Sequence, residues 1–185
     1  MRNINTSYAY LIMGLILILD QISKVLVRTF MHMYQSIPIL KSVFGETFML
    51  TRVNNTGAAF SIGFSSDQTN RIFFIITTVL ALIFILYLLY QSIHRIQVIA
   101  FGLVLGGALG NLIDRFLFGG VTDFINVDFP DFIMQRFPIF NIADSSIFIA
   151  VCLLIIDMIF IKDAHMIETP DLNEHISEEI HTKEI

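Results

Sequence analysis

The stretch IFFIITTVLALIFILYLLY, which runs from Ile72 to Tyr90, decides the fold class of this chain. Its 19 residues include no charged side chain. As a helix that rises about 1.5 Å per residue, the stretch covers roughly 28 Å, about one hydrocarbon core. Lipid offers the backbone no hydrogen-bond partners, so a segment that crosses a bilayer has to be helical. We therefore predict a membrane-spanning helix over residues 72–90.

Three further apolar runs, at about 8–27, 96–113 and 145–161, have the same character. The 185-residue chain is 55% hydrophobic and 15% charged, which is too apolar for an ordinary soluble domain. The first run could be a signal peptide because Arg2 precedes it, but no A-x-A-like site follows, and we read it as a retained helix. The predicted fold class is an all-α membrane protein built on a four-transmembrane-helix bundle. Residues 1–162 form its single membrane-embedded domain, and 163–185 form an acidic tail.

Two long loops, at about 28–71 and 114–144, lie on the face opposite the termini. In the first, the alternation from Thr47 to Val53 predicts a strand and a small sheet. Asn54 to Gly57 then predicts a turn that needs a positive φ at Gly57. The long-loop face carries more Lys and Arg than the other face, and the positive-inside rule would place it in the cytoplasm.

Two carboxylates, Asp123 and Asp144, each lie in a short polar island beside an apolar run on this face. An ionised carboxylate near lipid costs about 2.5–3.5 kcal/mol at a helix centre, so it indicates function by default. Asp144 also suits the N-cap of the fourth helix, where the helix dipole favours an acid. Asp123 is flanked by Val121 and Phe124 and so suits an apolar pocket. Asp128, in the same loop, is expected to be solvated.

Other polar residues have both a structural and a functional interpretation. Asn111, Asp114 and Arg115 share one face at the end of the third helix, either as a helix-end ion pair or as part of a site. Asp20 and Lys24, four residues apart, form either an intrahelical salt bridge or a support for a neighbouring site.

Asp157 lies 13 residues after Asp144, which places it about 20 Å deeper and on another helix face. We therefore expect it to lie outside any site that contains Asp144. The glycines at 102, 106 and 110 form a small-xxx-small stripe that predicts close helix packing.

Several chemistries fit this sequence poorly. It has no H-E-x-x-H zinc motif and no G-x-S-x-G nucleophile elbow. The single Cys152 lies in an apolar run without a histidine nearby in sequence. We expect no metal and no organic cofactor. The absence of a basic patch argues against nucleic-acid binding.

Read in order, five motifs resemble those of the bacterial lipoprotein signal peptidases, also called signal peptidase II. They are Asp20-Gln21-x-x-Lys24, Asn55-x-Gly57-Ala58-Ala59-Phe60-Ser61, Gly110-Asn111-x-x-Asp114-Arg115, Val121-x-Asp123-Phe124 and Phe140-Asn141-x-Ala143-Asp144-Ser145. The resemblance implies that Asp123 and Asp144 are a catalytic aspartate dyad. It implies site-lining or supporting roles for Asn55, Asn111, Arg115 and Asn141, and we expect support from Asp114, Asp20, Lys24 and Gly57.

The resemblance also implies a small extracytoplasmic β-cradle and a short extracytoplasmic helix over the cleft. It implies cytoplasmic termini, against the charge count, in a multi-pass protein of the bacterial cytoplasmic (inner) membrane with its active site at the extracytoplasmic edge. The expected substrates are diacylglyceryl-modified prolipoproteins, cut on the amino side of the lipidated cysteine. Membrane lipid is an expected partner, inhibition by the cyclic peptide globomycin is expected, and one chain is expected to suffice as a functional monomer.

Two alternatives come from other classes of protein. A small proton- or cation-coupled transporter or channel subunit would use Asp114, Asp123 and Asp144 as an ion path and predicts carboxylates spread through the membrane depth. A structural membrane protein assembled through the glycine stripe would leave the polar islands unexplained.

Overall fold

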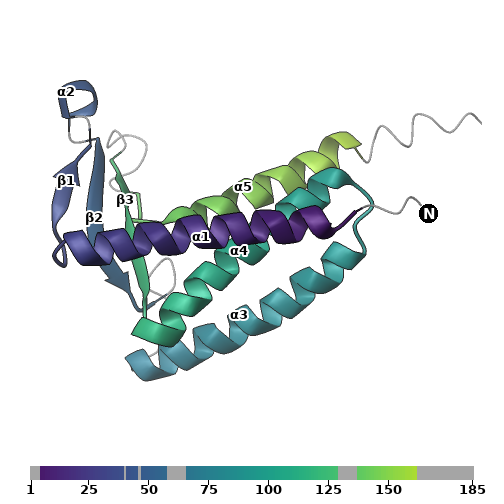
Figure 1. Cartoon of the computed structure of the whole chain (residues 1–185), viewed down its shortest axis with the longest axis horizontal. Coiled ribbons are helices and arrows are strands. Elements are labelled where there is room, and N and C mark those ends of the chain that lie inside the picture. The colour runs from purple at the N-terminus through teal and green to yellow at the C-terminus, as the bar shows by residue number, and fades with distance from the viewer. Residues whose placement is uncertain (1–4, 40, 46, 58–65, 129–136, 162–185) are drawn as a thin grey trace, which may run out of the picture.

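The computed structural model describes residues 5–39, 41–45, 47–57, 66–128 and 137–161. Four long helices lie side by side, and a small sheet sits at one end of them (Figure 1). The order along the chain is α1 (Ser7–Phe30), β1 (Ser36–Pro38), α2 (Lys41–Phe44), β2 (Phe48–Asn55), α3 (Asp67–Tyr90), α4 (Arg95–Phe118), β3 (Val121–Val127), α5 (Ile142–Ile156) and the π-helix η2 (Asp157–Ile161). We call the two ends of the bundle the sheet end and the termini end.

Four helical segments, Ser7–Phe30, Asp67–Tyr90, Arg95–Phe118 and Ile142–Phe160, are long and apolar enough to cross a membrane. Their outward faces carry large exposed apolar side chains, for example Leu11 at 70%, Leu80 at 61% and Phe148 at 70% exposure. A surface of this kind is stable in lipid and unfavourable in water. The prediction of a multi-pass membrane protein is confirmed.

The glycine stripe packs α4 against α1, as predicted. A Cβ on Gly102 would lie 2.7 Å from the carbonyl oxygen of Ala9, and one on Gly106 would lie 2.8 Å from Cβ of Ile16. The helices can approach this closely because these positions have no side chain. The apolar core at the termini end, with Leu89, Val98, Phe101 and Leu105, continues the same contact.

The helices extend further than the apolar runs from which they were predicted. The third span was expected to end near 113, whereas α4 continues to Phe118, and α3 begins at Asp67 rather than 72. Helix α4 continues because Asn111 and Asp114 point into the protein, where both are buried and hydrogen-bonded. Polar residues that find partners inside the bundle therefore do not end the helix.

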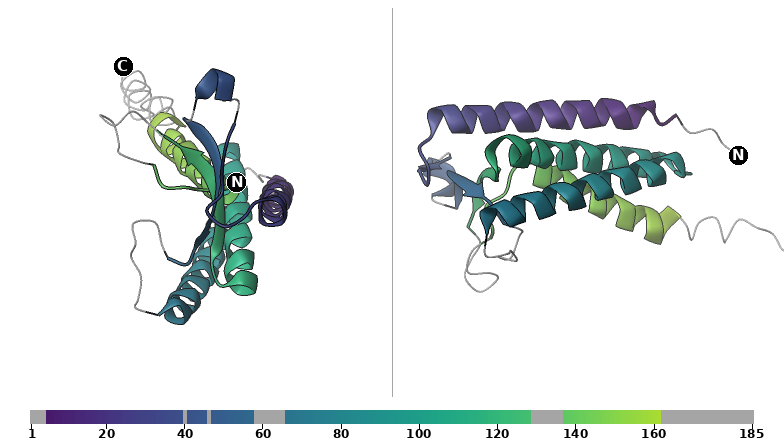
Figure 2. Two further views of the ribbon diagram at one scale, coloured as in Figure 1. Left: turned by 90° about the vertical axis from the view of Figure 1, so that its left-hand side faces the viewer. Right: turned by 90° about the horizontal axis from the view of Figure 1, so that it is seen from below.

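The sheet is antiparallel with the strand order β1-β2-β3. Strand β3 follows α4 directly, and in the register of β2 and β3 Val53 lies opposite Asp123 and Asn55 opposite Val121. Figure 2 shows the sheet across the end of the bundle, where it joins the ends of α1 and α4. The predicted strand and small sheet are confirmed. The short helix α2 lies at the far tip of the sheet (Figure 1), so a helix over the cleft stays a prediction.

Glycine conformation differs from the prediction. Positive φ occurs at Gly45 and Gly119 but not at Gly57, so the predicted left-handed turn there is wrong. The Gly57 N–H instead donates to the Asn55 side chain at 3.1 Å, which forms the turn without a left-handed residue. The left-handed Gly119, with φ of 80°, ends α4.

Asp157 lies at the termini end, far from the other buried carboxylates. His94 Nδ1 is 2.8 Å from one Asp157 oxygen, and Gln97 Nε2 donates to the other at 2.6 Å. These contacts tie the start of α4 to the end of α5. We expect Asp157→Asn to retain in full the peptidase activity that the resemblance implies, and to lower the melting temperature by a few degrees, because the charge-assisted bonds weaken. An inactive variant with normal folding would contradict this separation.

Candidate active site

Asp123 lies in the middle of β3 and is only 3% exposed. One carboxylate oxygen accepts a hydrogen bond from Asn141 Nδ2 at 2.7 Å, and the other accepts one from Asn55 Nδ2 at 3.0 Å. Burial, and then the negative charge of Asp144, raise the pKa of the Asp123 carboxyl to about 7. Strand β3 therefore presents a carboxyl group that loses its proton only as the pH rises through about 7.

Asp144 is not the N-cap of α5, as one interpretation of the sequence held, but occupies the third helical position. Asn141 is the N-cap, and its side-chain oxygen accepts from the Asp144 N–H at 2.9 Å. In return, one Asp144 oxygen accepts from the Asn141 N–H at 3.2 Å. This reciprocal capping box holds the Asp144 carboxylate at the positive end of the helix.

The Asn141 side chain connects the two acidic residues. This buried side chain donates from Nδ2 to Asp123, while its Oδ1 accepts from the Asp144 backbone. A single amide thus sets the position of both acids, one on β3 and one on α5. Asp123 and Asp144, 21 residues apart in the sequence, are in this way brought to one site.

Asn111 holds Asp144 from the opposite side. Its Nδ2 donates to Asp144 Oδ1 at 2.8 Å, and its Oδ1 accepts from Lys24 Nζ at 2.8 Å. A lysine ammonium can only donate, so Lys24 determines which end of the Asn111 amide faces Asp144. Asn111 Oδ1 also accepts from Asn141 Nδ2 at 3.2 Å, which links the two amides.

Lys24 is itself fully buried between two carboxylates. Its Nζ lies 2.8 Å from Asp20 and 3.7 Å from Asp114, and none of the three side chains is exposed. Asp20 reaches onward and accepts from the backbone N–H of Ala143 at 3.0 Å, next to Asp144. The predicted i, i+4 salt bridge is therefore present and connects α1 to the start of α5.

Asp114 connects α1, α4 and β3 and does not line the cavity beside Asp123. Its oxygens accept from the Thr122 N–H at 2.9 Å and from Arg28 at 3.1 Å. Arg28 and Thr122 were missed by the sequence interpretation. Arg28 had a usable signal, since Asp20, Lys24 and Arg28 recur every four residues and share one face of α1. Thr122 had none, because both its N–H bond to Asp114 and the bond from Arg28 to its hydroxyl, at 3.0 Å, depend on how β3 packs against α1 and α4.

Arg115 lines the cavity from α4, and its guanidinium carbon lies 5.0 Å from the centroid of the Phe74 ring. Phe74 of α3 thus holds the Arg115 guanidinium in a cation–π contact. Gly57 lines the cavity beside Asn55. Residues 58–61 of the same motif lie outside the described part of the chain.

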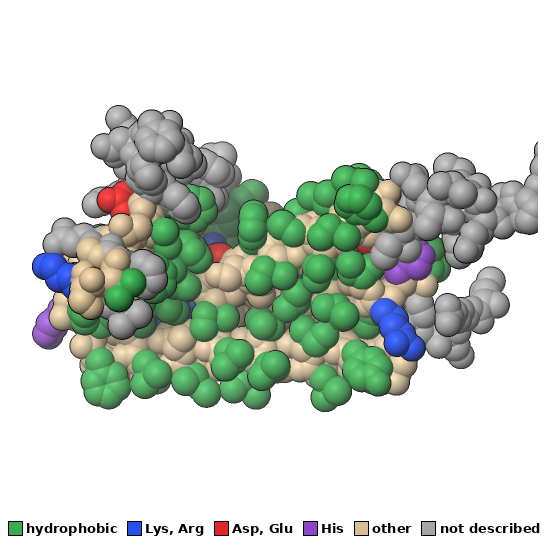
Figure 3. Space-filling view, turned by 90° about the horizontal axis from the view of Figure 1, so that it is seen from above, with side chains coloured by type: hydrophobic (Ala, Val, Ile, Leu, Met, Phe, Trp, Pro, Cys, Tyr) green, Lys and Arg blue, Asp and Glu red, His purple; other side chains and the backbone are tan. Residues whose placement is uncertain are grey.

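These side chains open into a cavity of about 720 Å³ between α4, α5 and β3. Its polar floor is formed by both aspartates, Asn55, Asn111 and Arg115. Its apolar walls are formed by Val121, Phe137, Pro138, Ile139, Phe140, Ile147, Phe148 and Val151. Figure 3 shows a hollow between the sheet end and α5, with acidic and basic side chains at its base among hydrophobic ones. Among the described residues, no group of three or more His, Cys, Asp or Glu side chains is placed to hold a metal.

The arrangement suits acid–base chemistry on a partly lipidic ligand. Two carboxylates held at one site, one of them buried, cannot both ionise cheaply, so they share a proton near neutral pH. Such a pair can remove a proton from water with one member and donate a proton with the other. The apolar walls open toward the lipid-facing side of α5, where Phe148 is 70% exposed.

Comparison with known proteins identifies the family of this chain. The family model described as signal peptidase (SPase) II matches residues 12–160. The chain is 42% identical over 148 residues to a lipoprotein signal peptidase of Halothermothrix orenii, covering 80% of this chain and 92% of that one. It is also 42% identical over 151 residues to one of Bacillus subtilis, covering 81% and 92%. A solved structure of a bacterial membrane enzyme matches with a TM-score of 0.75 and 33% identity, covering 90% of this chain and 94% of that one. The chain belongs to the signal peptidase II family.

Proposed function

We propose that this protein removes signal peptides from diacylglyceryl-modified prolipoproteins by hydrolysing the peptide bond on the amino side of the lipidated cysteine. Family membership supports the reaction. The observation that carries the chemistry is that Asn141 donates to both carboxylates, from its side-chain Nδ2 to Asp123 at 2.7 Å and from its backbone N–H to Asp144 at 3.2 Å.

In the proposed mechanism, Asp144 is the ionised member and Asp123 carries the shared proton. Asp144 takes a proton from a water molecule, and the water oxygen attacks the scissile carbonyl carbon. Asp123 donates its proton to the carbonyl oxygen as the tetrahedral intermediate forms. The intermediate collapses when Asp144, now protonated, gives its proton to the leaving amine and the carbon–nitrogen bond breaks. Asp123 takes a proton back from a hydroxyl group of the intermediate as the carbonyl re-forms, which restores the starting protonation of both residues. The hydrogen bonds from Asn111, Asn55 and Asn141 hold the two carboxylates in position. Arg115 binds a substrate carbonyl.

The apolar half of the cavity fits a lipid-modified substrate. Ile147, Phe148 and Val151 run along one side of α5 from the catalytic level into the membrane. Acyl chains placed along this side would remain in a hydrocarbon environment while the peptide bond sits over the carboxylates. This continuity between polar floor and lipid-facing wall supports diacylglyceryl-cysteine as the recognised group.

The site and orientation are proposed together. The sheet end faces the extracytoplasmic side of the bacterial cytoplasmic membrane, and both termini lie in the cytoplasm. The excess of Lys and Arg at the sheet end would place that end in the cytoplasm by the positive-inside rule. Several of these cations have partners inside the protein, so they are weaker evidence for orientation. Arg28 pairs with Asp114, and Arg52 donates to the carbonyls of Arg28 and Met31. One chain holds both aspartates, which supports a functional monomer. The inhibitor globomycin is expected to occupy the cavity lined by Asp123 and Asp144.

A transporter or channel would need carboxylates distributed through the membrane depth. The carboxylates of Asp20, Asp114, Asp123 and Asp144, the first three of them buried, instead gather toward the sheet end, and Asp157 is bound to His94 and Gln97 at the other end. Ion translocation is therefore not favoured.

The first experiment incubates the purified protein with a precursor carrying a diacylglyceryl-cysteine and, in parallel, with the same precursor lacking the lipid. We expect cleavage of the lipidated precursor, with the new amino terminus at the modified cysteine by mass spectrometry. A protein that cleaves neither precursor, or that cuts elsewhere, would contradict the proposed function.

The pKa of Asp123 predicts the alkaline limit of activity. Its proton is present below pH about 7 and leaves as the pH rises through that value. Because the mechanism needs this proton, kcat/KM is expected to fall above pH about 7, approaching about tenfold per pH unit. Steady-state cleavage from pH 5 to pH 9 measures this limb, and a profile that stays flat to pH 9 would contradict the assigned acid.

A further inference from the structure

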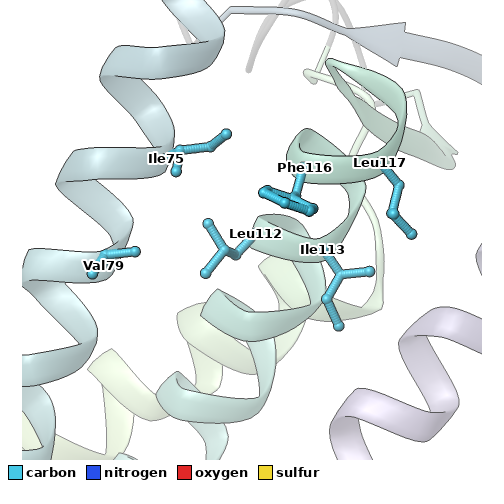
Figure 4. A pocket seen from close by; sticks show the side chains of 6 residues that line it. All are labelled: Ile75, Val79, Leu112, Ile113, Phe116 and Leu117. Carbon is cyan, nitrogen blue, oxygen red and sulfur yellow. The ribbon is translucent and has the colours of Figure 1, made fainter.

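A second groove lies between α3 and α4 and shares no lining residue with the catalytic cavity. Its volume is about 460 Å³. Figure 4 shows it open between the two helices, and its lining is entirely apolar: Ile75, Val79, Leu112, Ile113, Phe116 and Leu117. On α4, Ile113 lies about 200° around the helix from Asn111, so the groove occupies a different face from the catalytic one.

The groove lies in the sheet-end half of the bundle. Phe116 and Leu117 belong to the last turn of α4 and are 65% and 62% exposed. At the termini end α3 and α4 are closed together by the core around Leu89 and Phe101. There α3 also contacts α1, where the Tyr10 and Tyr90 hydroxyls lie 2.9 Å apart. An apolar groove of this shape in a spanning segment is exposed to the acyl chains of one leaflet.

A cation stands at the outer end of the groove. Arg71, Ile75 and Val79 follow each other at four-residue steps and share one side of α3. Arg71 donates to the carbonyl oxygen of Phe116 at 2.5 Å, and a Cβ on Gly119 would lie 3.9 Å from its Cδ. The guanidinium is thereby held over the end of α4, where the apolar lining begins. Val79 is about 12 Å deeper along α3.

We propose that this groove binds an anionic phospholipid, with one acyl chain against its apolar lining and the phosphate on Arg71. A guanidinium has five N–H donors in a plane and pairs well with phosphate oxygens, so a bond to one carbonyl is compatible with binding a phosphate. The order of the groups, with a cation at headgroup level and apolar side chains below it, matches the order of groups in a phospholipid. The proposal does not depend on the peptidase reaction.

The absence of tryptophan from the chain makes the site directly measurable. Phe116→Trp places a single fluorophore in the groove. Phe30→Trp is the matched control, an equal aromatic exchange at the sheet end of α1, where Phe30 is 75% exposed and outside the groove. Each variant is reconstituted in phosphatidylcholine bilayers with increasing fractions of phosphatidylglycerol. In one series the phosphatidylglycerol carries brominated acyl chains, in the other the phosphatidylcholine does, and quenching of the tryptophan fluorescence reports the binding of the brominated lipid.

For Phe116→Trp we expect phosphatidylglycerol to bind about fivefold more strongly than phosphatidylcholine, the effect of about one basic residue near a membrane surface. For Phe30→Trp we expect the two lipids to bind equally, so that the ratio of phosphatidylglycerol binding to phosphatidylcholine binding is near one. In the double variant Phe116→Trp/Arg71→Gln this ratio should also fall to near one. Equal ratios at positions 116 and 30 would overturn the site, and a fivefold ratio that survives Arg71→Gln would overturn the role of Arg71. If Arg71→Gln fails to fold, native mass spectrometry of Phe116→Trp from mixed bilayers decides: retained phosphatidylglycerol supports the proposal, and its absence overturns it.

Discussion

Asp123→Asn and Asp144→Asn are each expected to lower kcat for precursor cleavage by about 10³-fold or more. Either change removes one half of the acid–base pair: without Asp123 the carbonyl oxygen has no proton donor, and without Asp144 water has no base. Folding should be retained, because an Asn side chain keeps an oxygen that can accept from Asn141 or Asn111. Both rates are measured with purified variants on the lipidated precursor, alongside their melting temperatures.

Asp128→Asn is the matched control for this pair. Asp128 directly follows β3, five residues after Asp123, and is exposed. We expect its activity to stay close to that of the unmodified protein. Full processing by either Asp123→Asn or Asp144→Asn would remove the proposed mechanism, and a comparable loss in Asp128→Asn would show that the assay reports general damage to the loop.

Lys24→Met is expected to have the largest effect on stability. Lys24 lies between Asp20 and Asp114, and all three side chains are fully buried. Removal of one partner from a buried ion pair leaves an uncompensated charge and costs about 3–5 kcal/mol. Thermal or denaturant unfolding in detergent measures the loss. Lys24→Met/Asp20→Asn should be more stable than the sum of the two single changes predicts, by about 1–3 kcal/mol, because both charges leave together.

The single variant Lys24→Met is also expected to change the pH dependence of kcat/KM, which a purely structural role of Lys24 would not do. The positive charge of Lys24 lowers the pKa of Asp123, so its removal raises that pKa further. The fall of kcat/KM at alkaline pH should therefore move to higher pH in Lys24→Met. The free amide of Asn111 would also lose its fixed orientation, and kcat should fall. An unchanged pH profile in folded protein would limit Lys24 to a structural role.

The helices could be predicted from the sequence because hydrocarbon leaves little freedom: an uncharged run such as 72–90 has to be helical. Helix ends were less predictable, because apolar runs end where polar residues begin. Asp20, Asn111 and Asp114 are polar yet lie inside helices, where partners on other segments stabilise them. Local composition contains no information about such distant partners.

The residues of the candidate site were predicted from the order of the motifs, but the hydrogen bonds between them were not. The sequence interpretation placed Asp123 and Asp144 on the same edge, whereas the roles of Asn141 as helix cap and bridge depend on the packing of β3 against α5. The predicted positive φ at Gly57 failed because the Asn55 side chain makes the turn by a hydrogen bond instead. Side-chain capping and backbone conformation compete at such positions, and residue type alone does not decide between them.

The central claim is that Asp123 and Asp144 act as one acid–base pair, and the titration of the Asp123 carboxyl carbon tests it most directly. The measurement uses ¹³C NMR of protein labelled at the aspartate carboxyl carbons, with Asp123→Asn for assignment. We expect Asp123 to titrate near pH 7 in the unmodified protein, and at lower pH in Asp144→Asn because a neighbouring negative charge has been removed. A midpoint below pH 4 in both proteins, or one unchanged by Asp144→Asn, would contradict the account.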